Sequence, residues 1–295
     1  MSLHHSFLAA AYQPIKLARE VGRSVGMVSE NQLRVLLYHD IAPGDQNNFA
    51  TQMRWLKQSW NFITVKQFEA MMLGEEPVQG RNLLLTFDDG FASNRQVADQ
   101  VLNPMGIQAL FFVVSKLVGI DNELEARKLI AASVCPGKQA EQLPAHWRSM
   151  GWRDLESLLE SGHVIGCHTG THARLSEVTS LTSLENEIIS SAQVLAQHLR
   201  TSVDHFSFTF GNLASFSETA LSVARQRFRF IHSGLRGDNS MGVSPLAIRR
   251  DSAEKQDSDF NYSVFSNKLL GAFLEGAADM RYAQSRAILD SWISR

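Results

Sequence analysis

The chain has 295 residues, of which 44% are hydrophobic and 20% are charged, the balance of an ordinary globular protein with a substantial core. Its 28 basic and 30 acidic residues give a net charge of -2 without any long basic block, so nothing in the composition indicates nucleic-acid binding. The two cysteines exclude a disulfide framework, and no stretch approaches the roughly 20 apolar residues that span a membrane.

Residues 1–32 are expected to form a helical extension with no chemistry of its own. They contain a short apolar patch, which Gln13, Pro14 and Lys16 interrupt, and they lack the basic and hydrophobic segments of a signal peptide. We therefore expect a soluble, cytoplasmic protein.

Between residues 33 and 252, short apolar or β-branched runs alternate with helical patterns. The clearest helical patterns, at 152–162 and 182–200, repeat apolar residues at spacings of three and four. Such alternation is typical of a parallel sheet or barrel with helices outside, and strands buried on both faces explain why Leu83, Leu84 and Leu85 follow one another. The expected strands cover residues 34–38, 61–65, 82–87, 108–114, 163–167, 205–210 and 228–232.

Two segments depart from this alternation. Residues 115–151 form a long insertion between a strand and the next helix, of the kind that builds a lid or a substrate wall. Residues 252–259 have the composition of a polar linker, and helical spacing returns around Leu269 and Phe273. The expected organisation is therefore a catalytic domain at 33–252, preceded by the helical extension and followed by a helical tail at 253–295.

The third expected strand ends on two adjacent carboxylates, Asp88 and Asp89, followed by Gly90. Asp and Gly favour turns, so these residues alone fit an ordinary turn. Ligands of α/β folds, however, bind just beyond the carboxyl ends of the strands. Two neighbouring carboxylates repel each other in a dry site unless a cation binds there. A metal ion would take one Asp as a ligand and leave the other to act as a base.

A histidine pair follows a later expected strand. His168 and His172 lie four residues apart around Gly170, in a stretch that favours a loop at a strand end over a helix interior. Such a pair is a weak signal by itself. Neutral imidazole suits Zn²⁺, Co²⁺, Ni²⁺ or Fe²⁺, and one Asp with two His leaves open positions on the ion, as catalytic sites do.

The motifs TFDDG and HTGTH, in this order and spacing, resemble the two leading motifs of the polysaccharide deacetylases (carbohydrate esterase family four, the nodulation-type deacetylase domain). The resemblance begins near LLYHDI, continues through SGHVIGCHT and HFSFTFG, and ends near LAIRRD, so it covers roughly residues 33–252. It implies an α/β fold, a distorted (β/α) barrel of about seven parallel strands with helices outside, to which the terminal segments add further helices.

The resemblance also implies a role for individual residues. Asp88 corresponds to the general base, and Asp89, His168 and His172 correspond to the ligands of one divalent metal ion, with Zn²⁺ favoured over Co²⁺, Ni²⁺ or Fe²⁺. Backbone N–H groups around Phe210 correspond to the donors to the oxyanion. The implied reaction is hydrolysis of an N-acetyl, less often an O-acetyl, group on a sugar.

Three features depart from the family's pattern. Thr209 stands where the family has a proline, which changes the segment that holds the oxyanion donors. The arginine that orients the base is missing, and Arg249 is favoured over Arg250 as its replacement. The late histidine that serves as the acid is also missing. His39 and His232, each at the end of an expected strand, are its candidate replacements, so the acid stays unassigned.

Together these residues predict a metal-dependent carbohydrate deacetylase that acts on a sugar, a glycan or a sugar nucleotide in surface glycan biosynthesis. Two alternatives stay open. One is a metal-dependent hydrolase of a non-sugar amide, such as a formamide or a cyclic imide. The other is a catalytically degenerate member that binds glycan, which the missing arginine and histidine suggest. The oligomeric state is not predicted.

Overall fold

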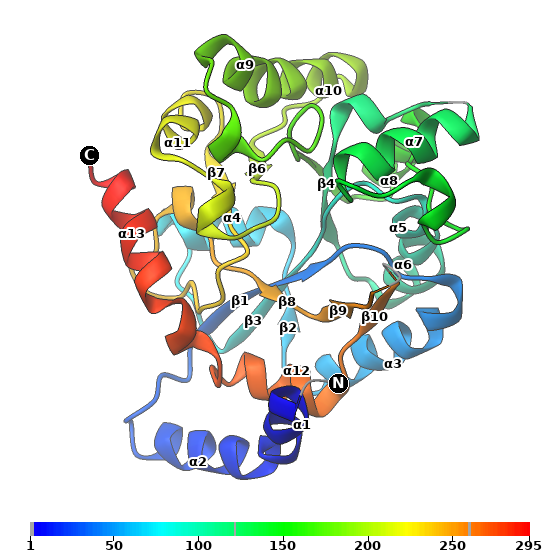
Figure 1. Ribbon diagram of the computed structural model, residues 1–295. Helices are drawn as coiled ribbons and strands as arrows, with labels where there is room; N and C mark the ends of the chain where they lie inside the picture. Colours follow the sequence, from blue (N-terminus) through cyan, green and yellow to red (C-terminus); the bar gives the residue numbers. More distant parts are fainter. Residues whose placement is uncertain (1–2, 121, 259–260) are drawn as a thin grey trace.

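The computed structural model describes residues 3–120, 122–258 and 261–295 (Figure 1). Seven parallel strands follow one another in the order β7-β6-β5-β4-β3-β1-β8 and form an open half-barrel, and the short β2 pairs with the start of β3. The predicted distorted (β/α) barrel is thereby confirmed. The strands are β1 (Gln32–Tyr38), β2 (Asn61–Phe62), β3 (Arg81–Phe87), β4 (Ala109–Val113), β5 (Val164–Cys167), β6 (His205–Ser207), β7 (Phe230–His232) and β8 (Asp251–Ser252).

Helices surround the sheet and extend both ends of the chain (Figure 1). The helical pattern predicted at 182–200 is a nearly continuous helix, in which a π-helical turn at Asn186–Ser190 joins α9 to α10. The α-helices are α1 (Leu3–Ala10), α2 (Tyr12–Ser24), α3 (Gln46–Leu56), α4 (Val65–Leu73), α5 (Ala92–Val97), α6 (Asn103–Met105), α7 (Glu123–Ser133), α8 (Trp152–Glu160), α9 (Leu181–Glu185), α10 (Ser191–Leu199), α11 (Glu218–Ala224), α12 (Asn267–Leu274) and α13 (Ala283–Ile293).

The long strands are buried on both faces, which is why their apolar runs do not alternate with polar residues. In β3, Leu83 and Leu85 belong to the large core beneath the outer helices, whereas Leu84 belongs to a second core on the opposite face. Phe68 of α4 closes that second core. No described helix has the length and apolar character that crossing a membrane requires.

The register of the strands determines which residues meet at the carboxyl edge of the sheet. Tyr38 of β1 pairs with Phe87 of β3, so His39 and Asp88 follow at the same level. Cys167 of β5 pairs with Val113 of β4, and His168 comes directly after it. The chain segments that hold the candidate site residues therefore leave the sheet at one edge.

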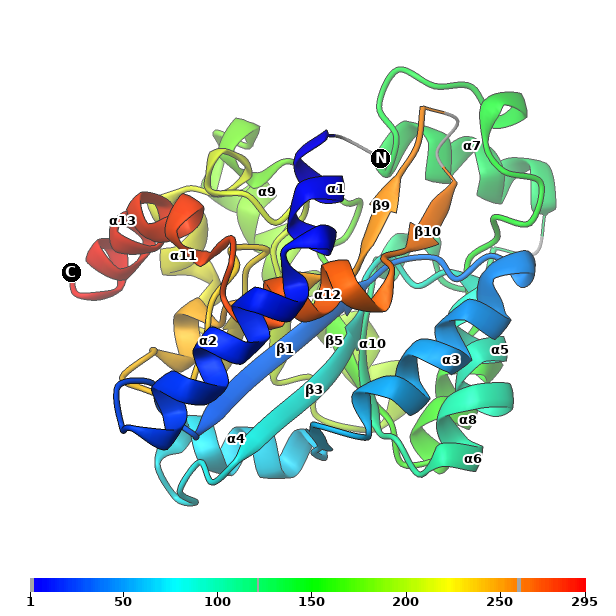
Figure 2. The same cartoon turned by 90° about the horizontal axis from the view of Figure 1, so that it is seen from below.

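The segment after β8 differs from its prediction. Much of the stretch expected to form a polar linker instead belongs to an antiparallel hairpin of β9 (Glu254–Gln256) and β10 (Tyr262–Val264), which rises beyond the end of β1 (Figure 2). The helical spacing predicted around Leu269 and Phe273 is confirmed in α12. The prediction was wrong because polar residues at a hairpin edge have the composition of a linker. Residues 259–260 of that stretch lie outside the described residues.

The helical extension at the N-terminus agrees with its prediction over α1 and α2, although residues 1–2 lie outside the described part of the chain. Tyr12 of α2 lies directly over Gly271 of α12, where an added Cβ would clash with the tyrosine ring. The N-terminal helices are thus packed against α12 on one side of the barrel.

Candidate metal centre

Asp88 and Asp89 lie at the end of β3, as expected, and both are buried. The N–H of Asp88 donates to the carbonyl of Tyr38 over 2.8 Å, so the strand pairing continues to this residue. Asp89 (φ 71°) and Gly90 (φ 74°) then adopt left-handed conformations. A Cβ at Gly90 would lie 3.1 Å from Val113, so glycine permits the tight turn that follows the two carboxylates.

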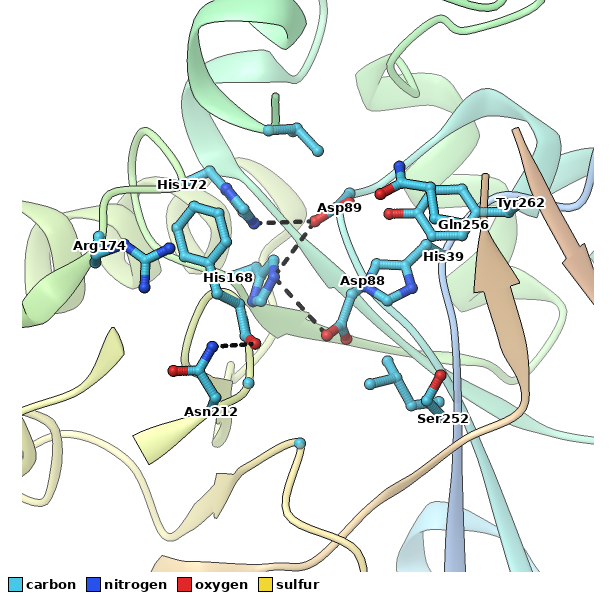
Figure 3. A pocket seen from close by; sticks show the side chains of 15 residues that line it. His39, Asp88, Asp89, His168, His172, Arg174, Asn212, Ser252, Gln256 and Tyr262 are labelled. Atoms are coloured by element: carbon cyan, nitrogen blue, oxygen red, sulfur yellow. Dashed lines mark hydrogen bonds and ion pairs between the residues drawn. The ribbon is translucent and has the colours of Figure 1, made fainter. Parts of the chain in front are cut away.

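Three side chains converge in front of this turn (Figure 3). Oδ1 of Asp89 lies 3.4 Å from Nε2 of His168 and 3.3 Å from Nε2 of His172. Each imidazole uses its other nitrogen for a backbone carbonyl: Nδ1 of His168 donates to Ser207 over 2.7 Å, and Nδ1 of His172 donates to Ser133 over 3.0 Å. These bonds occupy Nδ1 of each ring, so both Nε2 atoms face Asp89 and would be the atoms that bind an ion.

The three ligand atoms fit a divalent cation. They lie within 4.8 Å of one another, and Oδ1 of Asp89 is buried without a hydrogen-bond partner among the described residues. Burial would raise the pKa of Asp89, but the two histidines outweigh it and hold that pKa well below its usual value. Thr169 and His172 have positive φ angles of 66° and 59°, a strained backbone of the kind found at functional sites. One carboxylate and two imidazoles leave further positions on an ion open.

Asp88 is held beside these ligands by a buried arginine. Nη1 of Arg250 lies 2.7 Å from Oδ1 of Asp88, and Nη2 lies 2.8 Å from Oδ2. Arg250 also donates to the hydroxyl of Ser207 and to the carbonyl of Ser233, so its guanidinium is fixed in place. Burial would raise the pKa of Asp88, but the guanidinium outweighs it, so the pKa is lowered and the carboxylate is ionised at neutral pH.

The choice of Arg249 over Arg250 is corrected by these contacts. Arg249 donates to the carbonyl of Asp238 over 3.0 Å and lines a different cavity, away from Asp88. Adjacent residues in an extended chain point to opposite sides, so only one of the two arginines can enter the barrel. The sequence contains no local signal for which of the two does so.

His39 lines the pocket, as one of the two expected replacements for the acid. A single oxygen of buried Glu254, Oε1, accepts from both Nδ1 and the backbone N–H of His39, each over 2.7 Å. The imidazole also stacks on Tyr262, with ring centroids 4.8 Å apart. Burial lowers the pKa of His39, but the bond to Glu254 and its charge outweigh it and raise that pKa to about 9. His39 therefore carries a proton at neutral pH.

Glu254 was missed by the sequence analysis, because it lies in the stretch interpreted as a polar linker. Its carboxylate is enclosed although the residues around it in the sequence are polar, so composition contained no signal for it. The tertiary structure alone pairs it with His39.

His232 does not lie in the pocket, which corrects the second candidate for the acid. Its Nε2 bonds Nδ1 of His205 over 3.0 Å, and its ring packs edge-on against Phe112 with centroids 4.9 Å apart. Burial lowers the pKa of His232 well below its usual value, so the ring is neutral. The chain continues past His232 before it reaches the pocket at Gly234. The residue that ends the strand is therefore directed into the barrel interior.

Phe210 and Gly211 form a tight turn on the wall of the pocket. Both are in the left-handed region, with φ angles of 60° and 65°, and a Cβ at Gly211 would lie 2.9 Å from the Cα of Gly234. The ring of Phe210 packs edge-on against His172, with centroids 4.7 Å apart. The turn therefore brings backbone groups close to the converging ligands even though Thr209 replaces the family's proline.

The pocket has a volume of about 370 Å³ and opens above Asp88 and Asp89 (Figure 3). His39, Gln256 and Tyr262 line one wall, and Arg174 and Asn212 lie on the opposite wall (Figure 3). Behind Tyr262 stands buried Trp147, from the long insertion, with ring centroids 6.0 Å apart. Val134 from the same insertion also lines the pocket, which agrees with its expected part as a wall.

Comparisons with known proteins all find polysaccharide deacetylases. The model of the family described as polysaccharide deacetylase matches residues 75–227. Over 104 residues the chain is 29% identical to YxkH of Bacillus subtilis (strain 168), provisionally named a polysaccharide deacetylase. That match covers 33% of this chain and 37% of YxkH, so it spans little more than a third of the curated relative.

Solved structures share the fold. IcaB from Ammonifex degensii superposes with a TM-score of 0.63 at 20% identity, over 83% of this chain and 98% of that one. The Streptococcus pyogenes deacetylase PplD, solved in complex with acetate, gives a TM-score of 0.58 at 17% identity, over 75% of this chain and 92% of that one. At these identities the likeness establishes the architecture of the barrel.

Proposed function

Because the chain belongs to the polysaccharide deacetylase family, we propose that it is a metal-dependent hydrolase that removes an N-acetyl, or less often an O-acetyl, group from a sugar. The observation that carries the proposal is the position of an ionised, arginine-bound carboxylate, Asp88, directly beside the convergent ligand atoms of Asp89, His168 and His172. A base next to an open cation site is the arrangement that acyl hydrolysis by water requires.

Asp89, His168 and His172 would hold the ion, with Zn²⁺ favoured over Co²⁺, Ni²⁺ or Fe²⁺ because imidazole and carboxylate suit it well. A bound divalent cation supplies Lewis acidity to the acyl carbonyl and to the attacking water at this position. The carbonyl bonds of Ser207 and Ser133 orient the two imidazoles before any ion arrives.

Asp88 takes the proton of the water as its oxygen adds to the acyl carbon. Arg250 keeps Asp88 ionised and fixes both carboxylate oxygens, so the base does not have to be oriented during the reaction. Backbone N–H groups of the turn at Phe210 and Gly211 donate to the oxyanion that develops on the carbonyl oxygen.

His39 gives its proton to the leaving nitrogen as the carbon–nitrogen bond breaks, so that the products are acetate and a sugar amine. Glu254 keeps the acid ready for this step, because its carboxylate holds the imidazole protonated at neutral pH and fixes the ring through Nδ1. Stacking on Tyr262 further restrains the imidazole, which lies on the wall of the pocket opposite Arg174 (Figure 3).

The degenerate, glycan-binding alternative loses its main support in this arrangement. It rested on a missing base-orienting arginine and a missing late histidine, and Arg250, bonded to Asp88, and His39, in the pocket, are candidates for those two roles. Hydrolysis of a non-sugar amide stays open as the second function. The cytoplasmic location and the part in surface glycan biosynthesis stay predictions from the sequence.

Acetate release tests the proposal. Purified protein is dialysed against Zn²⁺ and supplied with N-acetylated sugars, O-acetylated sugars and non-sugar amides, with Asp88→Asn as the matched control. We expect acetate from a sugar substrate and a loss of about 10²–10⁴-fold in the variant, which keeps its metal ligands. Turnover confined to the non-sugar amides would select the second function, and no turnover of any compound by metal-loaded protein would contradict both.

A further inference from the structure

We propose that Arg174 forms a subsite for an anionic group, a phosphate or a carboxylate, that the acetylated sugar carries next to its reactive acyl group. The inference rests on the proposed function, since it names the substrate class of the same pocket. Nothing in the sequence motifs marks this arginine, which follows the second histidine of the HTGTH stretch by two positions.

Arg174 is close to the reacting centre. Its guanidinium lies over the ring of Phe210, 4.2 Å from the centroid, and the same ring packs against the metal-ligand candidate His172. The ring of Phe210 therefore lies between the guanidinium of Arg174 and the candidate metal ligand His172. Figure 3 shows Arg174 on the same side of the pocket as His172. A sugar whose acetamido group reaches the centre can present a substituent on a neighbouring carbon to Arg174.

The guanidinium of Arg174 is positioned by its neighbours but keeps hydrogen-bond donors available for a ligand. Its Nε forms an ion pair with Oε1 of Glu177 over 3.4 Å, and the Glu177 side chain is 75% exposed. Such an exposed pair contributes little, and it leaves both terminal nitrogens without a hydrogen-bond partner among the described residues. Two parallel N–H donors on a rigid plane match a phosphate or a carboxylate.

The charges in the pocket favour an anion at this place. Asp88 is neutralised by Arg250, and the charge of His39 is balanced by Glu254. Arg174 is the one lysine or arginine among the described residues that line the pocket. A divalent ion on Asp89 would add further positive charge, so a substrate carrying an anion is attracted and one carrying free amines is repelled.

The two walls of the pocket differ, which gives the substrate an orientation. Besides His39, whose charge is paired with Glu254, the wall opposite Arg174 presents Gln256 and Tyr262, which are uncharged at neutral pH (Figure 3). Asn212 lies beside Arg174 and is held by a bond to the carbonyl of Phe210. The anionic group is therefore expected on the side of Arg174, and the acidic proton of His39 on the other.

Kinetics on charged and neutral substrates test the subsite. Zinc-loaded full-length protein is assayed with N-acetylglucosamine 1-phosphate, with N-acetylmuramic acid, which carries a carboxylate, and with the neutral methyl glycoside of N-acetylglucosamine. We expect Arg174→Ala and Arg174→Gln to lower kcat/KM for an anionic substrate by about 10- to 100-fold, and to change it less than about threefold for the neutral one. A loss of kcat/KM confined to one of the two anionic substrates shows whether the subsite binds the phosphate or the carboxylate.

Glu177→Gln is the matched control, because it removes the ion pair and leaves Arg174 in place. It should keep or increase the preference for the anionic substrate. The subsite is overturned if Glu177→Gln reproduces the loss, which would reduce Arg174 to a structural residue, or if Arg174→Ala lowers kcat/KM equally for charged and neutral substrates. Wild-type turnover without any preference for an anion overturns it as well, while the proposed function stands.

If no substrate is turned over, the subsite can still be tested by measuring how tightly the anionic sugars bind to an inactive variant. Zinc-loaded Asp88→Asn protein is titrated calorimetrically with N-acetylglucosamine 1-phosphate and with N-acetylmuramic acid, each with and without Arg174→Ala. Weaker binding of either by about 10-fold or more in the double variant supports the subsite even if the proposed function fails. Equal affinities overturn it, because the anion would then be bound by the metal alone.

Discussion

Arg250 binds Asp88 through two parallel hydrogen bonds of 2.7 and 2.8 Å, in a site where neither side chain is exposed to solvent. The two residues are 162 positions apart, one at the end of β3 and the other directly before β8. A bidentate pair of this kind fixes the carboxylate in one orientation and keeps it ionised. The orientation of the proposed base therefore depends on a residue that only the tertiary structure brings beside it.

Removing Arg250 should be costly to both stability and activity. Arg250→Ala leaves the charge of Asp88 buried and unpaired, which we expect to lower the free energy of unfolding by about 3–5 kcal/mol. Urea denaturation and kcat/KM for acetate release measure the two effects. Arg249→Ala is the matched control and should change kcat/KM less than about threefold, since Arg249 contacts Asp238 and lines another cavity. Comparable losses in the two variants would refute the assignment of Arg250.

Loss of a metal ligand should be visible without any substrate. His168→Ala removes one of three converging ligand atoms, so we expect near one zinc per chain in the wild type and much less in the variant. Added Zn²⁺ should raise the Tm of the wild type and leave that of the variant almost unchanged, because an ion stabilises only the state that binds it. Elemental analysis with equal zinc in both proteins would contradict the site.

The pH profile should report the His39–Glu254 pair. The pKa of His39 is raised to about 9, so its proton is present below that pH and is lost as the pH rises through it. We expect the alkaline limb of kcat/KM near pH 9 in the wild type. Glu254→Gln removes the charge that raises this pKa, so the limb should move toward lower pH.

The raised pKa of His39 contributes to stability with a defined sign. Because the folded-state pKa of His39 lies above its unfolded value, the contribution is complete below about pH 6.5 and disappears as the pH rises toward 9. Thermal unfolding of wild type and Glu254→Gln across this window measures it. An alkaline limb that stays in place in Glu254→Gln would show that His39 is not the acid.

The turn at Phe210 should not tolerate a side chain at its glycine. In Gly211→Ala, the new methyl group would lie 2.9 Å from the Cα of Gly234 and the residue would keep a positive φ of 65°, so the backbone has to move. We expect kcat to fall on the order of 10²–10³-fold if the turn supplies oxyanion donors. Gly44→Ala, where an added Cβ meets nothing within 4 Å, is the control and should leave kcat unchanged.

Several parts of the fold and the site follow from local sequence. Buried parallel strands require continuous apolar runs, so the strand that ends at Phe87 and the two carboxylates after it can be located from a few residues. The same holds for His168 and His172, since ligands bind beyond the carboxyl ends of such strands. In each case the determining residues lie close together in the chain.

Other parts depend on contacts between distant segments. Neighbouring residues of an extended segment point to opposite sides, and in this segment the side of Arg250, not that of Arg249, faces the barrel. The side chain of His232 faces the barrel interior for the same reason. Glu254 meets His39 across 215 positions, from a hairpin whose composition resembles a linker. The sequence by itself located the candidate base and the candidate metal ligands, because each motif is a short stretch with its own chemistry. Only the tertiary structure decided which residues bond to them, because strand register, and the side of the sheet that each side chain faces, depend on strand pairing over the whole chain.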